Sequence, residues 1–189
     1  MKHYILYLLL GLSLAGCCND DDQPENPLDQ LPPATQTGAN TAGCLVDGEV
    51  FLPNNKSMQP LICNYLDGKD FSIVISRKID GITYKIYIYI GDTQLEVGQT
   101  YELREEIDGT SKFGWYYIQY PLPDLYTFNY KTKSTIIGEL VITHHDFDKA
   151  ILSGTFWFDA QFNSSEYYNG EVNENKIIKV REGRFDMEY

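Results

Sequence analysis

An apolar side chain at every second position, in run after run beyond residue 43, restricts the fold of this chain more than any other feature. The segments 83–90 and 152–159 are the clearest examples. A period of two places alternate side chains on opposite faces of a β-strand, and no stretch of a dozen residues keeps the 3.6-residue period of a helix. The sequence therefore predicts strands rather than helices.

Asp-Gly dipeptides separate several of these runs, at 47–48, 67–68 and 80–81. Both residue types tolerate the positive φ angles of a tight hairpin turn, so each dipeptide predicts a hairpin. The pattern indicates an all-β fold: a single antiparallel β-sandwich or barrel-like domain of about ten short strands over residues 44–189. Beyond the runs already named, strands are expected near 100–104, 114–120, 125–130, 135–143, 176–181 and 184–189.

The N-terminal residues are typical of an exported lipoprotein. Lys2 precedes a short apolar segment, 4–14, which falls well short of the roughly 20 residues of a membrane-spanning helix. The sequence Leu-Ala-Gly-Cys, which ends at Cys17, then matches the lipobox of bacterial lipoproteins. We therefore predict a signal peptide over 1–16 and lipidation of Cys17, whose thiol accepts the diacylglycerol. The alternative is an ordinary secretory signal in which this cysteine is incidental.

Residues 17–43 combine an acidic run with a segment rich in Pro, Gln, Thr, Asn and Gly. After the lipidated Cys17 we expect a flexible, acidic and Pro-rich linker, because so few large apolar residues cannot offset the entropy of ordering. The acidic run at 19–22 resembles the surface-export signal of Bacteroidota lipoproteins. This favours an outer-membrane lipoprotein displayed on the cell surface; a solvated linker on a periplasm-facing lipoprotein is the alternative.

The net charge restricts the partners. With 15 Lys+Arg against 27 Asp+Glu, the chain carries −12 at pH 7. Such a chain cannot neutralise the phosphates of a nucleic acid, so we expect no nucleic-acid partner. Anionic headgroups would not hold it either, which leaves the N-terminal lipid anchor as the expected contact with the membrane.

Cys44 and Cys63 lie on strands that are expected to be neighbours. In an exported protein such a pair more often forms a disulfide than a metal site, so we predict a disulfide. Closing this loop would stabilise the domain by about 3 kcal/mol. If the strand register places the two Cα atoms more than about 7 Å apart, the bond cannot form and the pair is two buried thiols.

Four segments of the chain carry a family resemblance: Leu-Pro-Pro-Ala-Thr-Gln-Thr-Gly at 31–38, Gly-Cys-Leu-Val-Asp-Gly at 43–48, Leu-Ser-Gly-Thr-Phe-Trp-Phe at 152–158 and Gly-Arg-Phe-Asp at 183–186. Together they resemble an uncharacterised family of small β-rich lipoproteins of the Bacteroidota, a domain of unknown function. The resemblance spans nearly the whole mature chain. It implies a lipidated envelope protein with a β-rich domain, and it implies no activity. Ala42 departs from the family pattern, which has an aromatic residue there.

The sequence offers little catalytic machinery. The mature chain has two histidines, His144 and His145, and adjacent strand residues point to opposite faces, so both could bind one metal ion only within a turn. A polar hairpin tip is the simpler interpretation. No nucleophile elbow or phosphate loop is present. We therefore expect no metal, no cofactor and no catalytic residue, with a hydrolase that uses paired carboxylates as the least favoured alternative.

Aromatic density is the one feature that points to binding. Eight aromatic residues fall between 113 and 130, and a period of two cannot bury both faces of 115–117 unless each side is covered. We expect a non-catalytic binding module for a glycan or a protein ligand. A structural or accessory component of an envelope complex is the alternative. The candidate ligand-binding residues are Trp115, Tyr117, Tyr120 and Tyr126.

Overall fold

The computed structural model describes four segments of the chain: residues 26–107, 110–121, 126–166 and 173–189. The predicted signal peptide and Cys17 lie outside these residues. Within the described segments the helical structure is a single 3-10 turn, η2 (Pro27–Gln30). None of the helical structure described is long and apolar enough to cross a membrane.

The structure is all-β, and eleven antiparallel strands form one continuous sheet. The prediction of an all-β, antiparallel domain is therefore confirmed. Along the sheet the order is β2-β1-β11-β10-β9-β6-β7-β5-β4-β3, and β8 pairs with both β10 and β7. In chain order the strands are β1 (Thr41–Val46), β2 (Glu49–Phe51), β3 (Leu61–Leu66), β4 (Asp70–Ile79), β5 (Ile82–Ile90), β6 (Thr100–Ile107), β7 (Thr110–Gln119), β8 (Thr127–Lys131), β9 (Gly138–Asp146), β10 (Ile151–Glu166) and β11 (Ile177–Glu188).

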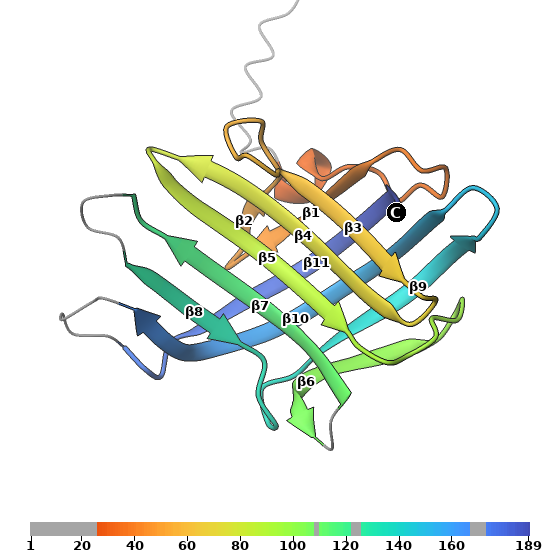
Figure 1. The fold of residues 1–189 in the computed structure, drawn as a ribbon. Coiled ribbons are helices and arrows are strands. Elements are labelled where there is room, and N and C mark those ends of the chain that lie inside the picture. Colours follow the sequence, from red (N-terminus) through yellow and green to blue (C-terminus); the bar gives the residue numbers. More distant parts are fainter. Residues whose placement is uncertain (1–25, 108–109, 122–125, 167–172) are drawn as a thin grey trace, which may run out of the picture.

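The sheet folds over into two layers (Figure 1). The front layer in this view consists of β3, β4, β5, β7 and β8, and the rear layer consists of β2, β1, β11, β10 and β9. The layers are joined along one side, where β6 pairs with β7 and β9 while β8 pairs with β7 and β10. The opposite side is open, because β2 and β3 are the two end strands of the sheet. The fold is thus a β-sandwich closed along one side.

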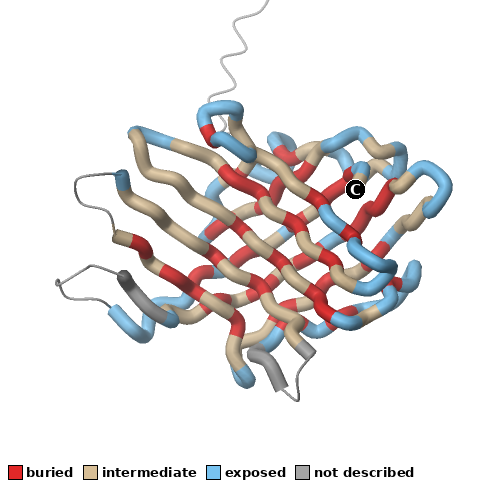
Figure 2. Tube along the Cα trace, viewed as in Figure 1, coloured by how far each residue is buried: buried red, intermediate tan, exposed pale blue. Residues whose placement is uncertain are grey.

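Buried residues recur along the strands of both layers (Figure 2), and they form one hydrophobic core cluster. Burial alternates along β5 as its period of two predicts: Ile86 and Ile88 are fully buried, whereas their neighbours along the strand are partly exposed. Small residues in one layer make room for rings from the other. A Cβ atom on Gly114 of β7 would lie 2.6 Å from the ring of Phe158 of β10, so only glycine fits there without a shift.

All three Asp-Gly turns form as the sequence predicts. In each dipeptide both residues have positive φ, between 49° and 89°, as a tight hairpin requires. One strand assignment differs from the prediction, since the two strands expected at 176–181 and 184–189 form a single strand, β11. Glu182, with φ of 54°, lies in a bulge opposite Trp157 that absorbs the extra residue, and the ladder with β10 then continues.

The predicted flexible linker differs more. The part of it that the structure describes begins at residue 26, and residues 26–40, here called the N-terminal strap, lie on the outer face of the rear layer. Leu31 is buried, and β1 already begins at Thr41 rather than at Cys44. From residue 26 onward the described part of the linker is therefore held against the domain, by hydrogen bonds as well as by the burial of Leu31.

Asp186 of β11 provides those hydrogen bonds. Its side chain is only 1% exposed, and its carboxylate accepts hydrogen bonds from the Oγ1 hydroxyl of Thr35 at 2.6 Å and the backbone N–H groups of Thr37 and Gly38, both at 2.9 Å. The hydroxyl of Ser153 on β10 adds a fourth at 2.8 Å. Burial by itself raises the pKa of Asp186, but these donors outweigh it and hold the pKa far below its usual range.

The predicted disulfide is not formed, and Cys44 and Cys63 are both buried free thiols. The expectation that their strands are neighbours was wrong. Cys44 lies on β1 opposite Phe51, whereas Cys63 lies on β3 opposite Ile73. The chain passes from the rear layer to the front layer between β2 and β3, so the two strands belong to opposite layers.

Candidate functional site

An aromatic band crosses the outer face of the front layer. It consists of Tyr87 and Tyr89 from β5 and Phe113, Trp115 and Tyr117 from β7. These strands pair so that Tyr87 lies opposite Trp115, and Tyr89 lies opposite Phe113. Neighbouring ring centroids within the band are 5.7–6.4 Å apart. The alternation of strand residues explains why these rings face outward, since the residues between them, such as Tyr116, are buried between the layers.

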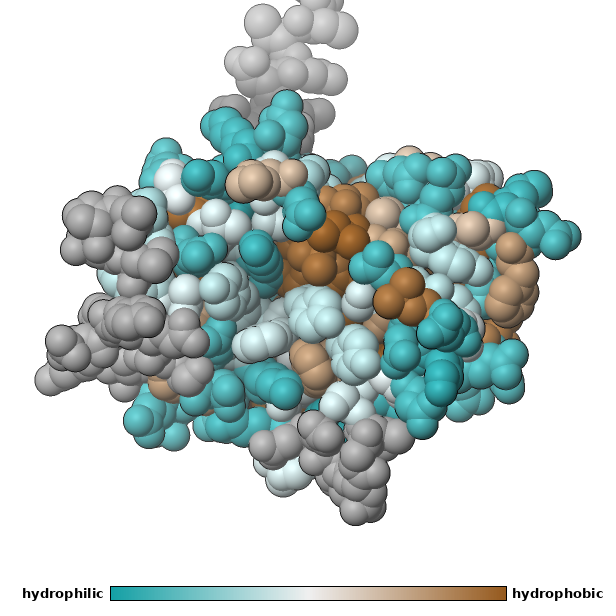
Figure 3. Space-filling model, in the orientation of Figure 1, coloured by the Kyte–Doolittle hydropathy of each residue, from teal (hydrophilic) through white to brown (hydrophobic). Residues whose placement is uncertain are grey.

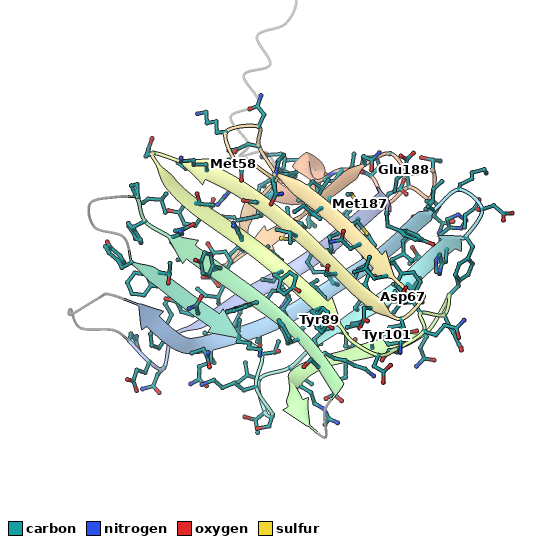
Figure 4. The ribbon with its side chains drawn as sticks, in the orientation of Figure 1. Met58, Asp67, Tyr89, Tyr101, Met187 and Glu188 are labelled. Atoms are coloured by element: carbon teal, nitrogen blue, oxygen red, sulfur yellow. The ribbon has the colours of Figure 1, made fainter. Side chains whose placement is uncertain are left out.

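One end of the aromatic band forms the floor of a groove of about 690 Å³, here called the outer groove. Hydrophobic side chains lie at the centre of this face, bordered by paler and more hydrophilic ones (Figure 3). Met58, which is 100% exposed, stands at the rim on the loop between β2 and β3 (Figure 4). The lining residues are Lys56, Ser57, Met58, Gln59, Ile62, Val74, Lys78, Thr83, Lys85, Tyr87, Trp115, Tyr117 and Gln119.

The register of four strands places the floor in one row. Ile62 of β3 lies opposite Val74 of β4, Val74 lies opposite Tyr87 of β5, and Tyr87 lies opposite Trp115 of β7. The floor therefore changes from aliphatic to aromatic along a line that crosses the strands. Directly opposite Trp115 on the next strand is Lys131, which lies outside the groove. Cross-strand neighbours of this kind support one another, because their Cβ atoms are close.

The charged side chains that line the outer groove are all positive. Lys56, Lys78 and Lys85 line it, and no Asp or Glu is found among its described lining residues. The ammonium of Lys85 lies 5.8 Å from the ring centroid of Tyr117, its cross-strand partner. Burial, and to a smaller extent Tyr89, raises the pKa of Tyr87, so this phenol keeps its proton at neutral pH.

Trp115 occupies the centre of the aromatic band. Its ring lies between those of Tyr87 and Tyr117, each with a centroid 6.4 Å away. Lys131 places its ammonium 4.0 Å from the ring centroid of Phe113 and 6.0 Å from that of Trp115. The indole N–H of Trp115 is buried and has no acceptor among the residues described. Rings from two strands and a cation therefore fix the orientation of this side chain.

The structure brings together only two of the four predicted ligand-binding residues. Trp115 and Tyr117 share the outer face of β7 and both line the outer groove. Tyr120 and Tyr126 lie instead at the β7–β8 end, where their rings stack with centroids 4.2 Å apart. Both rings also contact Phe128, which packs against the core, so this pair belongs to the end of the sandwich rather than to the groove.

The other residues that line the groove were not predicted as site residues, and Lys78, Lys85 and Tyr87 are among them. The alternation in 83–90 does place Lys85 and Tyr87 on one face of their strand. It does not show what lies beside them, however, because β5 pairs with β7 and not with its successor in the chain, β6. The aromatic band is therefore a product of sheet order, which a single sequence does not reveal.

His144 and His145 do not share a site. The Nε2 atom of His145 lies 3.0 Å from the hydroxyl of Tyr189, and its ring packs edge-on against Tyr65. Burial lowers the pKa of His145; the Leu95 backbone partly opposes this shift, and His144 adds to it. Among the described residues no group of three or more His, Cys, Asp and Glu side chains could hold a metal ion. His145 thus belongs to an aromatic cluster at one end of the sandwich.

A second groove, of about 450 Å³, lies on the outer face of the rear layer around Trp157. Here two of the central polar side chains, Trp157 and Arg181, are already paired. The indole N–H of Trp157 donates to Glu139 at 3.1 Å, and the guanidinium of Arg181 lies 5.2 Å from the Trp157 ring centroid while it binds Asp159 at 2.5 Å. Because its indole and one of its guanidinium groups already have protein partners, this groove is a weaker candidate than the outer groove.

The outer groove therefore combines three kinds of group on one surface: aromatic rings, neutral hydroxyl and amide groups, and ammonium groups. Such a surface can bind a ligand by stacking, hydrogen bonds and charge. No protein-family model, curated protein or solved structure matches this chain. What the groove binds is accordingly inferred from its own side chains.

Proposed function

We propose that this chain is a non-catalytic binding module of the cell envelope that holds a glycan in its outer groove. The observation that carries the proposal is the row of Tyr87, Trp115 and Tyr117 along the floor of a concave surface. These rings are partly exposed, and aromatic rings that gather at one place on a protein surface are typical of a binding surface. The volume of about 690 Å³ lies within the usual range of small-molecule sites.

The chemistry of the groove favours a glycan. A sugar ring has an apolar C–H face, which an aromatic ring can cover, and an edge of hydroxyl groups, which need hydrogen-bond partners. Thr83 and Gln119 lie next to each other in the ladder between β5 and β7, beside the aromatic floor. A hydroxyl and an amide so placed can donate to and accept from sugar hydroxyls. Both requirements of a sugar are therefore met on one face.

The groove favours binding over hydrolysis. Glycosidases place two carboxyl groups about 5–9.5 Å apart on either side of the scissile bond. The described residues that line the outer groove include no Asp or Glu, so they cannot supply such a pair. A hydrolytic role is therefore less favoured than a binding role at this surface.

We further propose that acyl chains on Cys17 hold the module at the outer membrane, on the cell surface. The lipobox ending at Cys17 and the acidic run at 19–22 support this location. The anchor is tested by mass spectrometry of the N-terminal peptide from membranes. We expect an acylated Cys17 as the first residue, and an unmodified chain that retains residues 1–16 would contradict the anchor. Protease treatment of intact cells then distinguishes the two leaflets.

Binding is tested with the full chain, purified in detergent, on an array of bacterial and plant glycans. We expect the wild type to retain at least one glycan and the Trp115→Ala variant to lose it, because the central ring of the floor is removed. Tyr120→Ala is the matched control: it also removes an aromatic ring, but from outside the groove. Failure of the wild type to retain any glycan, or equal losses in the two folded variants, would overturn the proposal.

A further inference from the structure

We propose that the ligand of the outer groove is an anionic glycan, one that carries carboxylate or sulfate groups. This inference rests on the proposed glycan-binding function and specifies its ligand class. The observation behind it is a reversal of charge: the chain has 27 acidic residues against 15 basic ones, yet the described lining of the groove holds three lysines and no acidic residue. A cleft lined by one sign of charge attracts ligands of the opposite sign.

The three lysines come from separate parts of the front layer. Lys78 of β4 lies opposite Thr83, and Lys85 lies two residues beyond Thr83 on β5, so both lysines are on the same face of neighbouring strands. Lys56 comes from the loop between β2 and β3, which also carries the exposed Met58. Two strands and a loop thus converge to bring the ammonium groups to one groove.

These lysines also lack a carboxylate partner among the described residues, whereas two lysines outside the groove have one. Lys69 is 3.0 Å from Asp92, and Lys149 is 3.3 Å from Asp146. In the part of the chain that the structure describes, Lys56, Lys78 and Lys85 form no ion pair. An anionic group on a ligand would therefore meet ammonium groups that are not already engaged by carboxylates, beside rings that can stack on a sugar.

The position of the groove favours a glycan over an acidic peptide. Extended peptides commonly bind a sheet by adding a strand to an open edge, where backbone N–H and C=O groups are unpaired. The floor of the outer groove is instead the face of a sheet, and the backbones of β4, β5 and β7 are already paired with one another beneath it. A peptide that lay across these three strands would find no free backbone partners on them, whereas sugar hydroxyls can use the side chains.

The test uses the full chain in detergent and four polymers as probes: polygalacturonate, dextran sulfate, neutral dextran and poly-glutamate. Affinity is measured by calorimetry at low and high salt. We expect binding to polygalacturonate, to dextran sulfate or to both, with little binding to dextran and poly-glutamate. Binding should weaken at high salt, since charge contributes to it. The two anionic glycans show whether carboxylate or sulfate is preferred.

The variants are designed to change charge alone. Lys78→Gln combined with Lys85→Gln should weaken binding of the anionic glycan about tenfold. Lys149→Gln, which removes a charge outside the groove, should leave the affinity unchanged. Thermal unfolding confirms that each variant folds. An unchanged affinity in the folded double variant would overturn the inference.

The remaining outcomes separate the inference from the function on which it rests. Dextran bound as tightly as polygalacturonate would overturn the anionic ligand while the glycan-binding function stands. Poly-glutamate bound equally well would also overturn the inference, because charge without sugar would then suffice. If the wild type bound none of the three glycans here and retained none on the array, the proposed function itself would fail.

Discussion

The Oγ1 hydroxyl of Thr35 donates a 2.6 Å hydrogen bond to the carboxylate of Asp186, which lies 151 residues later in the chain. The backbone N–H groups of Thr37, Gly38 and Ala39 donate to the same carboxylate, at 2.9–3.2 Å. One buried acid on β11 therefore holds the N-terminal strap against the rear layer. The segment between the predicted anchor and β1 is consequently part of the folded domain from residue 26 onward.

Asp186→Asn should destabilise the domain by about 2–4 kcal/mol. The asparagine has no charge, and its amide nitrogen would face N–H and O–H donors in place of a carboxylate oxygen. Urea unfolding measures the loss. Asp67→Asn is the control, because this exposed turn residue has φ of 50°, a conformation that asparagine also tolerates, and its stability should stay within about 0.5 kcal/mol of wild type. Equal effects of the two substitutions would contradict the role of Asp186.

Removal of the strap should have a related effect. A chain that begins at residue 40 should unfold at lower urea than one that begins at residue 26, because Asp186 then loses most of its hydrogen-bond donors. The two changes should not add: Asp186→Asn should cost less in the shorter chain than in the longer one. A double-mutant cycle measures this difference. Strict additivity would mean that the strap and Asp186 act independently.

The loss of unfolding free energy at low pH should also depend on Asp186. Its hydrogen bonds lower its pKa in the folded state below the ordinary value of about 3.9, so the unfolded chain binds a proton more readily. The stabilisation is complete above pH 3.9 and is lost as the pH falls below it. Between pH 5 and 2.5 the wild type should therefore lose more unfolding free energy than Asp186→Asn does. Parallel curves for the two proteins would show that other carboxylates control acid unfolding.

The alternation of apolar and polar residues predicts the strands of this protein well, but it does not predict the order of the strands in the sheet. The alternation around Ile86 and the turn at Asp80-Gly81 both follow from neighbours in the chain, and both are found in the structure. The proximity of Tyr87 to Trp115, in contrast, depends on the pairing of β5 with β7. These strands are neighbours in the sheet, although β6 lies between them in the chain. The position of the N-terminal strap could not be predicted for a similar reason. This polar segment is fixed by one carboxylate that lies far along the chain.

The two cysteines illustrate the same limit. Adjacency in the chain suggests a disulfide between Cys44 and Cys63, and the crossing from one layer to the other prevents it. We expect the urea unfolding curve to be the same with and without reductant, whereas loss of a disulfide would lower stability by about 3 kcal/mol. A difference of that size would contradict the free thiols.

Thiol reactivity provides an independent measurement. Burial raises the pKa of the Cys63 thiol to about 12, so at pH 8 only about one molecule in ten thousand carries the thiolate at this position. Burial also raises the pKa of Cys44, although Arg77 opposes part of that shift. Both should react with a thiol reagent only as fast as the domain unfolds. Rapid labelling of either cysteine in the native protein, located by peptide mass spectrometry, would contradict their burial.

His145 should make the domain sensitive to mild acid. Burial among Tyr65, Phe147 and Tyr189 lowers its pKa below the ordinary histidine value of about 6.5, so the unfolded chain takes up the proton first as the pH falls. Its neutral form thus stabilises the fold above pH 6.5, and this contribution declines from about pH 7 to pH 5. The wild type should therefore lose more unfolding free energy over that interval than His145→Gln, which has no titrating group there. His144→Gln should flatten the curve less, because His144, one residue away on the opposite face of β9, only adds to the shift in the pKa of His145. The reverse result, in which only His144→Gln flattens the curve, would assign the mild-acid sensitivity to the outward-facing ring and not to the aromatic cluster.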